Sequence, residues 1–116
     1  MIEFICQRDF EISISNIKKM DYVELLKKEC YFCIIINNRK FFEEPLFPIN
    51  EFLYEYMKWD RKGDFLYNTI ESDDNPLISF LKVEDDWIID SVWKMFECED
   101  RIDINELTTA IEKIYV

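Results

Sequence analysis

The chain has 116 residues, of which 49% are hydrophobic, and this length and apolar content predict one domain, residues 1–116, with a single core. One Gly and three Pro argue against a disordered or low-complexity protein. The formal net charge of −11 disfavours binding to a phosphate backbone or to an anionic membrane, so we expect neither nucleic acid nor membrane as a partner, whereas it favours fast encounter with basic proteins.

The chain opens with two predicted strands. Residues 2–6 are almost entirely apolar, and residues 10–17 alternate between apolar and polar side chains. An alternation with a period of two indicates a strand with one solvated face. Because only residues 7–9 separate the two runs, we expect them to pair as a hairpin.

A short helix is expected after Asp21. Asp21 and Glu24 have the spacing of a capping box, in which a short acceptor is followed three residues later by Glu. The residues expected to face inward are Val23, Leu26 and Cys30, with Leu25 alongside.

Residues 31–36 are almost all hydrophobic, which predicts a strand that is covered on both faces and central in its sheet. Asn37 and Asn38 suit a two-residue turn because Asn tolerates positive φ. Residues 39–43 would then return as the partner strand.

Pro45 and Pro48 are expected to break that ladder and to start a new element. Between residues 49 and 59 the apolar side chains recur at steps of three and four, which predicts a helix with one apolar face. Residues 61–63 would end this helix, with two cations in its last turn and Gly63 as the C-cap.

Three further strands are expected at residues 65–70, 77–83 and 87–96, joined by polar turns at 71–76 and 84–86. Neither face of the last strand is purely polar. Its odd-numbered face is the better candidate for the core.

Asp103 and Glu106 form a second capping box. The helix behind it carries one apolar stripe, made of Ile104, Leu107, Ile111, Ile114 and Tyr115. The element order is therefore ββ-α-ββ-α-βββ-α, which predicts an α+β fold. It would have an antiparallel sheet of about six to seven hairpin-joined strands, with three helices packed mainly on one face. We expect the open face to carry part of the acidic cluster of residues 71–106.

Cys30 and Cys33 have the C-x-x-C spacing of thiol redox motifs and of half a zinc site. The chain has no His, so only Cys6 and Cys98, from distant elements, could complete four zinc ligands. Buried Cys is common as a small hydrophobe, and four Cys in this chain do not resemble a disulfide framework. We therefore interpret the pair as core residues.

A calcium-binding loop is the second kind of metal site that the sequence suggests. Glu84 falls at position twelve counted from Asp73, but Leu77 and Ile78 occupy positions where the motif needs a ligand and Gly. A solvated turn with at most weak, non-specific cation binding fits better. Residues 60–62 match a fragment of metal-dependent nucleases only by chance, and we expect no metal and no cofactor.

No catalytic signature is present. Without His there is no Ser-His or Cys-His couple, and one Gly cannot build a phosphate-binding loop. Carboxylate pairs are too frequent in an acidic chain to indicate acid–base catalysis. We therefore expect a protein that is not an enzyme.

The start of the chain shows no signal segment and nothing long enough to span a membrane, so we expect a cytoplasmic location.

Residues 71–106 hold twelve carboxylates and three cations, together with large aromatic side chains. Acidic charge raises the rate of encounter with a basic protein, and exposed Trp dominates the energy of many interfaces. Either Trp87 or Trp93 could be the anchor, while the other aromatics fill the core. The candidate partner-binding residues are Asp73, Asp74, Glu84, Asp85, Asp86, Trp87, Asp90 and Trp93.

The segment Asn75-Pro76-Leu77-Ile78-Ser79-Phe80, followed by Asp85-Asp86-Trp87, Trp93 and Phe96-Glu97, resembles small acidic proteins of Bacillus-type bacteria. The resemblance covers roughly residues 64–114. Some of those proteins are immunity proteins that neutralise polymorphic toxins, so the resemblance implies binding and occlusion without a reaction. The sequence thus favours an inhibitor of a basic toxin domain, such as a nuclease. The alternatives are a general interaction or regulatory domain and a DNA mimic that occupies a nucleic-acid-binding protein.

Overall fold

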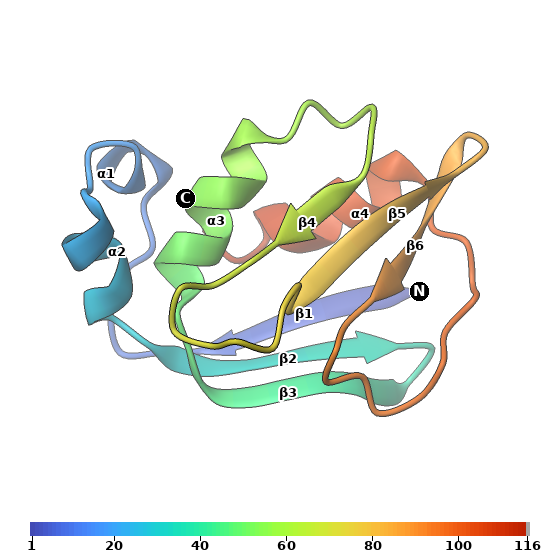
Figure 1. Cartoon of the computed structure of the whole chain (residues 1–116), viewed down its shortest axis with the longest axis horizontal. Helices are drawn as coiled ribbons and strands as arrows, with labels where there is room; N and C mark the ends of the chain where they lie inside the picture. Colours follow the sequence, from blue (N-terminus) through green and yellow to red (C-terminus); the bar gives the residue numbers. More distant parts are fainter. Residues whose placement is uncertain (116) are drawn as a thin grey trace.

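The computed structural model describes residues 1–115, and Figure 1 shows their arrangement in two three-stranded antiparallel sheets with four helices. The elements are β1 (Ile2–Gln7), α1 (Ile14–Ile17), α2 (Tyr22–Lys27), β2 (Cys30–Ile36), β3 (Arg39–Phe47), α3 (Ile49–Lys58), β4 (Phe65–Tyr67), β5 (Ile78–Val83), β6 (Asp86–Asp90) and α4 (Ile104–Glu112). The α+β class is confirmed. The single sheet of six to seven strands with three helices is not, because the strands divide into two sheets and a fourth helix is present.

The first sheet has the order β1-β2-β3, so the apolar strand β2 is central as predicted. The turn before β3 is confirmed, with φ of 50° at Asn37 and 66° at Asn38. The prediction that Pro45 breaks the ladder is wrong, because β3 continues to Phe47. The β2–β3 register shifts between Phe32 and Cys30, and this irregularity accommodates a residue that has no N–H.

The predicted hairpin between residues 2–6 and 10–17 is also wrong. Strand β1 pairs with β2, with Phe4 opposite Ile34, and residues 14–17 form the short helix α1. Ile14 and Ile17 are three residues apart, a spacing that places both on one side of a helical turn. The long apolar strand β2 offers β1 more cross-strand apolar contacts than the short alternating segment would.

The second sheet has the order β4-β5-β6 and is shorter than predicted. Strand β4 ends at Tyr67 and β6 ends at Asp90. The chain then leaves the sheet and runs beside β3, where the Met95 N–H donates to the Phe41 carbonyl at 2.8 Å and Phe96 packs edge-on against Phe41. Contacts with the first sheet therefore replace the missing half of the predicted strand 87–96.

The N-cap bond of both predicted capping boxes is confirmed, whereas the Glu106 carboxylate accepts from Ile2 and not from Asp103. Asp21 accepts a hydrogen bond from the Glu24 N–H at 2.9 Å, and Asp103 accepts one from the Glu106 N–H at 2.8 Å. In α2 the buried residue is Leu25, whereas Val23 is exposed.

Helix α3 buries the predicted apolar face but ends at Lys58, with Trp59 as its C-cap. Gly63 lies beyond the helix, so the prediction that residues 61–63 cap it is wrong. The carbonyl of Gly63 instead accepts from the Trp59 indole N–H at 2.7 Å.

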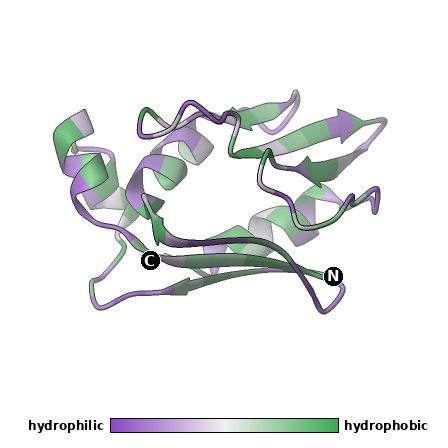
Figure 2. Cartoon of the chain, turned by 60° about the horizontal axis from the view of Figure 1, so that its bottom comes forward, coloured by the Kyte–Doolittle hydropathy of each residue, from purple (hydrophilic) through white to green (hydrophobic). Residues whose placement is uncertain are grey.

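Figure 2 shows that α3, α4 and the second sheet lie on one side of the first sheet, whose other side is uncovered. That open side carries outward-facing residues of β1–β3 such as Glu3, Tyr31 and Glu43. The single open face that we expected to carry part of the acidic stretch is divided, because the residues after 70 build the second sheet and its connections. Asp86 and Asp90 of that stretch lie on the less buried side of β6.

The core is a continuous aromatic cluster. Phe32 stacks on Phe47 with a centroid separation of 4.3 Å, and Phe65 stacks on Phe80 at 5.0 Å. Phe4 of β1 meets Phe80 of β5 edge-on, which joins the two sheets directly. Such aromatic pairs contribute about 0.5–1.5 kcal/mol each beyond the area they bury.

A buried polar pair lies inside this core. The Tyr67 hydroxyl donates to Glu51 Oε1 at 2.6 Å, and Tyr67 and Glu51 are 0% and 1% exposed. Burial first, and then the hydrogen bond to the carboxylate, raises the pKa of Tyr67 above its usual range.

Because this pKa is higher in the folded than in the unfolded chain, the folded state holds the phenol proton more tightly. We predict that the free energy of unfolding is constant with respect to this group below pH ~10 and falls as the pH rises above ~10. Replacing Tyr67→Phe should flatten that slope, and at neutral pH it should cost about 1 to 3 kcal/mol by leaving Glu51 without its donor. Urea titrations from pH 7 to 11 measure both effects. The exposed Tyr22→Phe is the control, and equal slopes for Tyr67→Phe and the parent chain would contradict the prediction.

Candidate functional site

The predicted partner-binding residues lie in two groups at opposite ends of the β5–β6 hairpin. Residues 84–86 form its tip. Asp90 lies at the other end, opposite Ser79 of β5, and the loop with Asp73 and Asp74 precedes β5 there. The structure therefore does not bring all eight residues into one surface.

At the tip, the acidic residues have separate surroundings. Glu84 has a φ of 57° and pairs with Arg101 at 2.8 Å, while Asp85 is exposed. Part of the negative charge at this end is therefore neutralised within the chain.

Trp87 is a core residue. It is 2% exposed, packs edge-on against Trp59 at 5.7 Å, and lies under the Lys82 ammonium, which is 3.9 Å from its ring centroid. The expectation that Trp87 could be a surface anchor is not supported, because a partner cannot reach a side chain sealed in this way. Its buried indole N–H has no hydrogen-bond partner among the described residues.

Trp93 has the opposite placement. It is half-buried, its ring lies parallel to Phe42 with a centroid separation of 6.4 Å, and its indole N–H donates to Asp74 Oδ2 at 3.2 Å. Asp90 pairs with Lys94 at 3.1 Å. Of the two tryptophans proposed as anchors, Trp93 has the accessible position.

A cavity of about 250 Å³ opens beside Trp93, and we call it the Trp93 pocket. Its apolar lining is Leu46, Pro48, Leu77 and Trp93, and its polar lining is Glu29, Glu44, Thr69, Glu71 and Ser72. These residues come from the connection before β2, from the end of β3, from the loop 68–77 and from the segment after β6. Sheet packing thus brings together positions that are up to 64 residues apart (29 to 93).

Among the residues that the structure describes, the carboxylates of the Trp93 pocket have no cationic partner. Within residues 1–115, no Lys or Arg lines the pocket and no ion pair includes Glu29, Glu44 or Glu71. Partial burial, and then the negative charges of Glu29 and Glu51, raise the pKa of Glu71. An incoming cation would relieve this repulsion, so the pocket is suited to a positively charged group.

Sequence reasoning missed most of this pocket. Glu29 and Glu44 lie in the first half of the chain, outside the acidic stretch, and only the pairing of β2 with β3 and the packing of the second sheet bring them to Trp93. No local pattern marks either residue. Glu71 lies in the acidic stretch, but its role depends on neighbours that the stretch does not contain.

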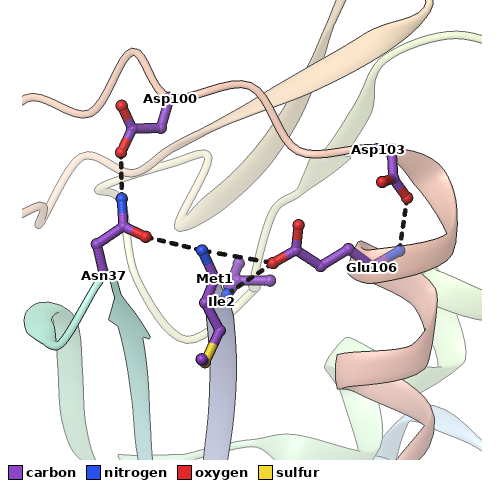
Figure 3. A network of polar contacts seen from close by, with 6 residues as sticks. All are labelled: Met1, Ile2, Asn37, Asp100, Asp103 and Glu106. Carbon is purple, nitrogen blue, oxygen red and sulfur yellow. Dashed lines mark hydrogen bonds and ion pairs between the residues drawn. The ribbon is translucent and has the colours of Figure 1, made fainter.

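Several acids of the same stretch have structural roles at the first sheet (Figure 3). Glu106 Oε2 accepts from the Ile2 N–H at 3.1 Å and lies 3.5 Å from the amino group of Met1. Asn37 accepts from that amino group through Oδ1 and donates through Nδ2 to Asp100. These contacts tie β1 and the β2–β3 turn to the start of α4. Met1, Ile2 and Glu106 also line a larger groove, of about 710 Å³, between β1 and α4.

Together, these features define an α+β protein of two packed antiparallel sheets with an acid-lined pocket at their junction. The chain belongs to the family DUF7878, whose description is a domain of unknown function and which matches residues 2–116. This match agrees with the sequence resemblance to small acidic bacterial proteins, which identified no named family. No curated protein and no solved structure matches the chain.

Two further observations concern the described residues. Among residues 1–115, no helix is sufficiently long and apolar to cross a membrane. In the same range, no three His, Cys, Asp or Glu side chains are grouped in a way that could hold a metal ion.

The electrostatics of the Trp93 pocket can be measured directly. We predict that the pKa of the Glu71 carboxyl lies above the usual range of a glutamate, and that replacing Glu29→Gln lowers it by removing a neighbouring negative charge. Carbon-detected NMR of the side-chain carboxyls, recorded from pH 3 to 7, follows this titration. Glu24→Gln, on the exposed surface of α2, is the matched control and should leave the Glu71 pKa unchanged. An unchanged Glu71 pKa in Glu29→Gln would show that the two carboxylates do not interact.

Proposed function

We propose that this protein is a non-enzymatic binding module for a basic protein, and that the Trp93 pocket is where the partner docks. The observation that carries the proposal is the set of unpaired carboxylates around an apolar floor, beside a half-buried tryptophan. In its most specific form, the proposal is an immunity-type inhibitor that occludes a basic toxin domain, such as a nuclease.

The pocket suits one long basic side chain. The aliphatic stem of Arg or Lys would lie on Leu77 and Trp93, and the charged end would reach the carboxylates at the rim. A volume of about 250 Å³ lies below the ~300–1,000 Å³ of typical small-molecule sites. A side chain inserted from a macromolecular partner therefore fits better than a free metabolite.

Apolar side chains next to the pocket add contact area. Leu46 lines the pocket and is 65% exposed, while Ile70 and Val92, each adjacent in sequence to a lining residue, are 67% and 47% exposed. Interfaces commonly combine such an apolar centre with charged groups that steer the encounter and select the partner. The combination supports protein binding over simple solvation of the charge.

Of the two alternatives, the DNA mimic receives less support from the geometry. A DNA mimic needs carboxylates spaced along one face like phosphates, whereas the acids here are divided between the β5–β6 tip, the Trp93 pocket and the contacts of Asp100 and Glu106 with the first sheet. A general interaction domain with an endogenous partner would use the same pocket. The nature of the neighbouring gene distinguishes it from a toxin inhibitor.

The test is binding to the product of the adjacent gene, provided that product is basic. We predict that Glu71→Lys and Glu29→Lys each weaken binding at least tenfold, because they place a cation where the partner's cation would lie. Trp93→Ala should weaken it by a similar or larger factor through loss of the anchor. Isothermal titration calorimetry at low and at moderate salt measures the affinities, and circular dichroism confirms the fold of each variant.

Asp85→Lys is the matched control, since it makes the same charge change at an exposed position on the far end of the β5–β6 hairpin. It should change the affinity less than threefold at moderate salt, where distant surface charges are screened. If Asp85→Lys weakens binding as much as Glu71→Lys, the Trp93 pocket is not the docking site. Absence of a complex at low salt would exclude this partner.

A further inference from the structure

Two thiols from different strands meet at one end of the first sheet. Cys6 Sγ of β1 and Cys30 Sγ of β2 lie 2.7 Å apart, and both cysteines are free. In the β1–β2 register Cys6 is opposite Phe32, so Cys30 is its diagonal neighbour on the same face of the sheet. The two sulfur atoms are therefore adjacent without any rearrangement of the chain.

The C-x-x-C spacing in the sequence points to a different pair, which the fold separates. Cys30 and Cys33 are an odd number of residues apart in β2, so their side chains project to opposite faces of the sheet. Cys33 lies opposite Ile5 of β1 and is 1% exposed. The strand geometry therefore places Cys6, and not Cys33, beside Cys30.

We propose that Cys6 and Cys30 are a thiol–disulfide exchange site, at which a low-molecular-weight disulfide such as oxidised glutathione links β1 to the start of β2. The reaction is a modification of the chain and is independent of the Trp93 pocket. It requires an accessible attacking thiol, a second thiol within bonding reach, and an external disulfide as the oxidant.

The two thiols differ in exposure and in pKa, as an attacking and a resolving thiol must. Cys6 is half-buried, and a hydrogen bond from Cys30 together with the nearby Arg8 guanidinium lowers its pKa despite partial burial. Cys30 is buried, and donating that hydrogen bond while losing solvent raises its pKa. Cys6 is therefore the attacking thiol and Cys30 the resolving one.

The steps conserve atoms and electrons. The Cys6 thiolate attacks one sulfur of the glutathione disulfide, whose S–S bond breaks, and one glutathione thiolate leaves and takes up a proton. Cys30 then loses its proton and attacks Cys6 Sγ, which breaks the mixed disulfide and releases the second glutathione as a thiol. The protein pair loses two electrons, and one glutathione disulfide is reduced to two thiols.

Incubating the folded full-length chain with oxidised glutathione at pH 8 tests the proposal by mass spectrometry. The expected product has a Cys6–Cys30 cross-link in its peptide map and two thiols left for alkylation. Cys30→Ser should instead accumulate a glutathione adduct on Cys6, whereas Cys6→Ser should leave Cys30 unmodified. Cys33→Ser and Cys98→Ser are the matched controls, because both residues are buried and should not change the product.

A second measurement does not depend on the variants. The cross-link closes a loop that contains α1 and α2, so the oxidised chain should melt about 10 °C above the reduced chain, and reductant should reverse the shift. A cross-link between other cysteines, or a Cys30→Ser chain without an adduct on Cys6, would overturn the proposal. So would a folded parent chain that keeps all four thiols free under conditions that oxidise the unfolded chain.

Discussion

The contact between the two sheets is the constraint on which the other features of the molecule depend. Phe4 and Phe80 bring β1 and β5 together, and the stacked pairs Phe32–Phe47 and Phe65–Phe80 extend this aromatic layer on either side. Each sheet has only three strands, and neither could bury its apolar face alone. Because this packing lays the second sheet over the first, the loop 68–77 and the segment after β6 come to lie beside the end of β3. The Trp93 pocket is a consequence of that packing.

The net charge of the chain is a poor guide to the position of the recognition surface that we propose. Asp103 caps α4, Glu106 holds the first strand, and Glu84 pairs with Arg101. Such contacts satisfy hydrogen bonds or neutralise charge within the fold, and exposed pairs of this kind contribute little to stability. In the Trp93 pocket, by contrast, Glu29, Glu44 and Glu71 form no ion pair among residues 1–115 and lie beside apolar side chains, and two of them lie outside the acidic stretch. Charge that remains unpaired is therefore more informative than the total.

Local patterns predicted local structure well. The two capping boxes depend on residues three positions apart, the turn at Asn37 and Asn38 depends on two residues, and the central position of β2 follows from one apolar run. The errors concern choices between distant partners. The alternation in residues 10–17 fits a strand, but β1 makes more cross-strand apolar contacts by pairing with β2. No local sequence pattern distinguishes Trp87 from Trp93 either. Trp87 is buried because it lies within β6, whereas Trp93 follows the end of that strand.

The two sides of the Trp93 pocket differ in how firmly they are held. Glu29 directly precedes Cys30 at the start of the central strand, and Glu44 lies in β3, so this side has the stability of the first sheet. The opposite side is an irregular segment, held near Trp93 by the hydrogen bond to Asp74 and by the Met95–Phe41 backbone contact. Segments with few backbone hydrogen bonds open at lower free energy than core strands. If the Trp93 pocket is the docking site that we propose, its tryptophan side can adjust to a partner while its carboxylates stay in place. Such a site suits a protein surface of imperfect complementarity better than a small ligand that needs a rigid cavity.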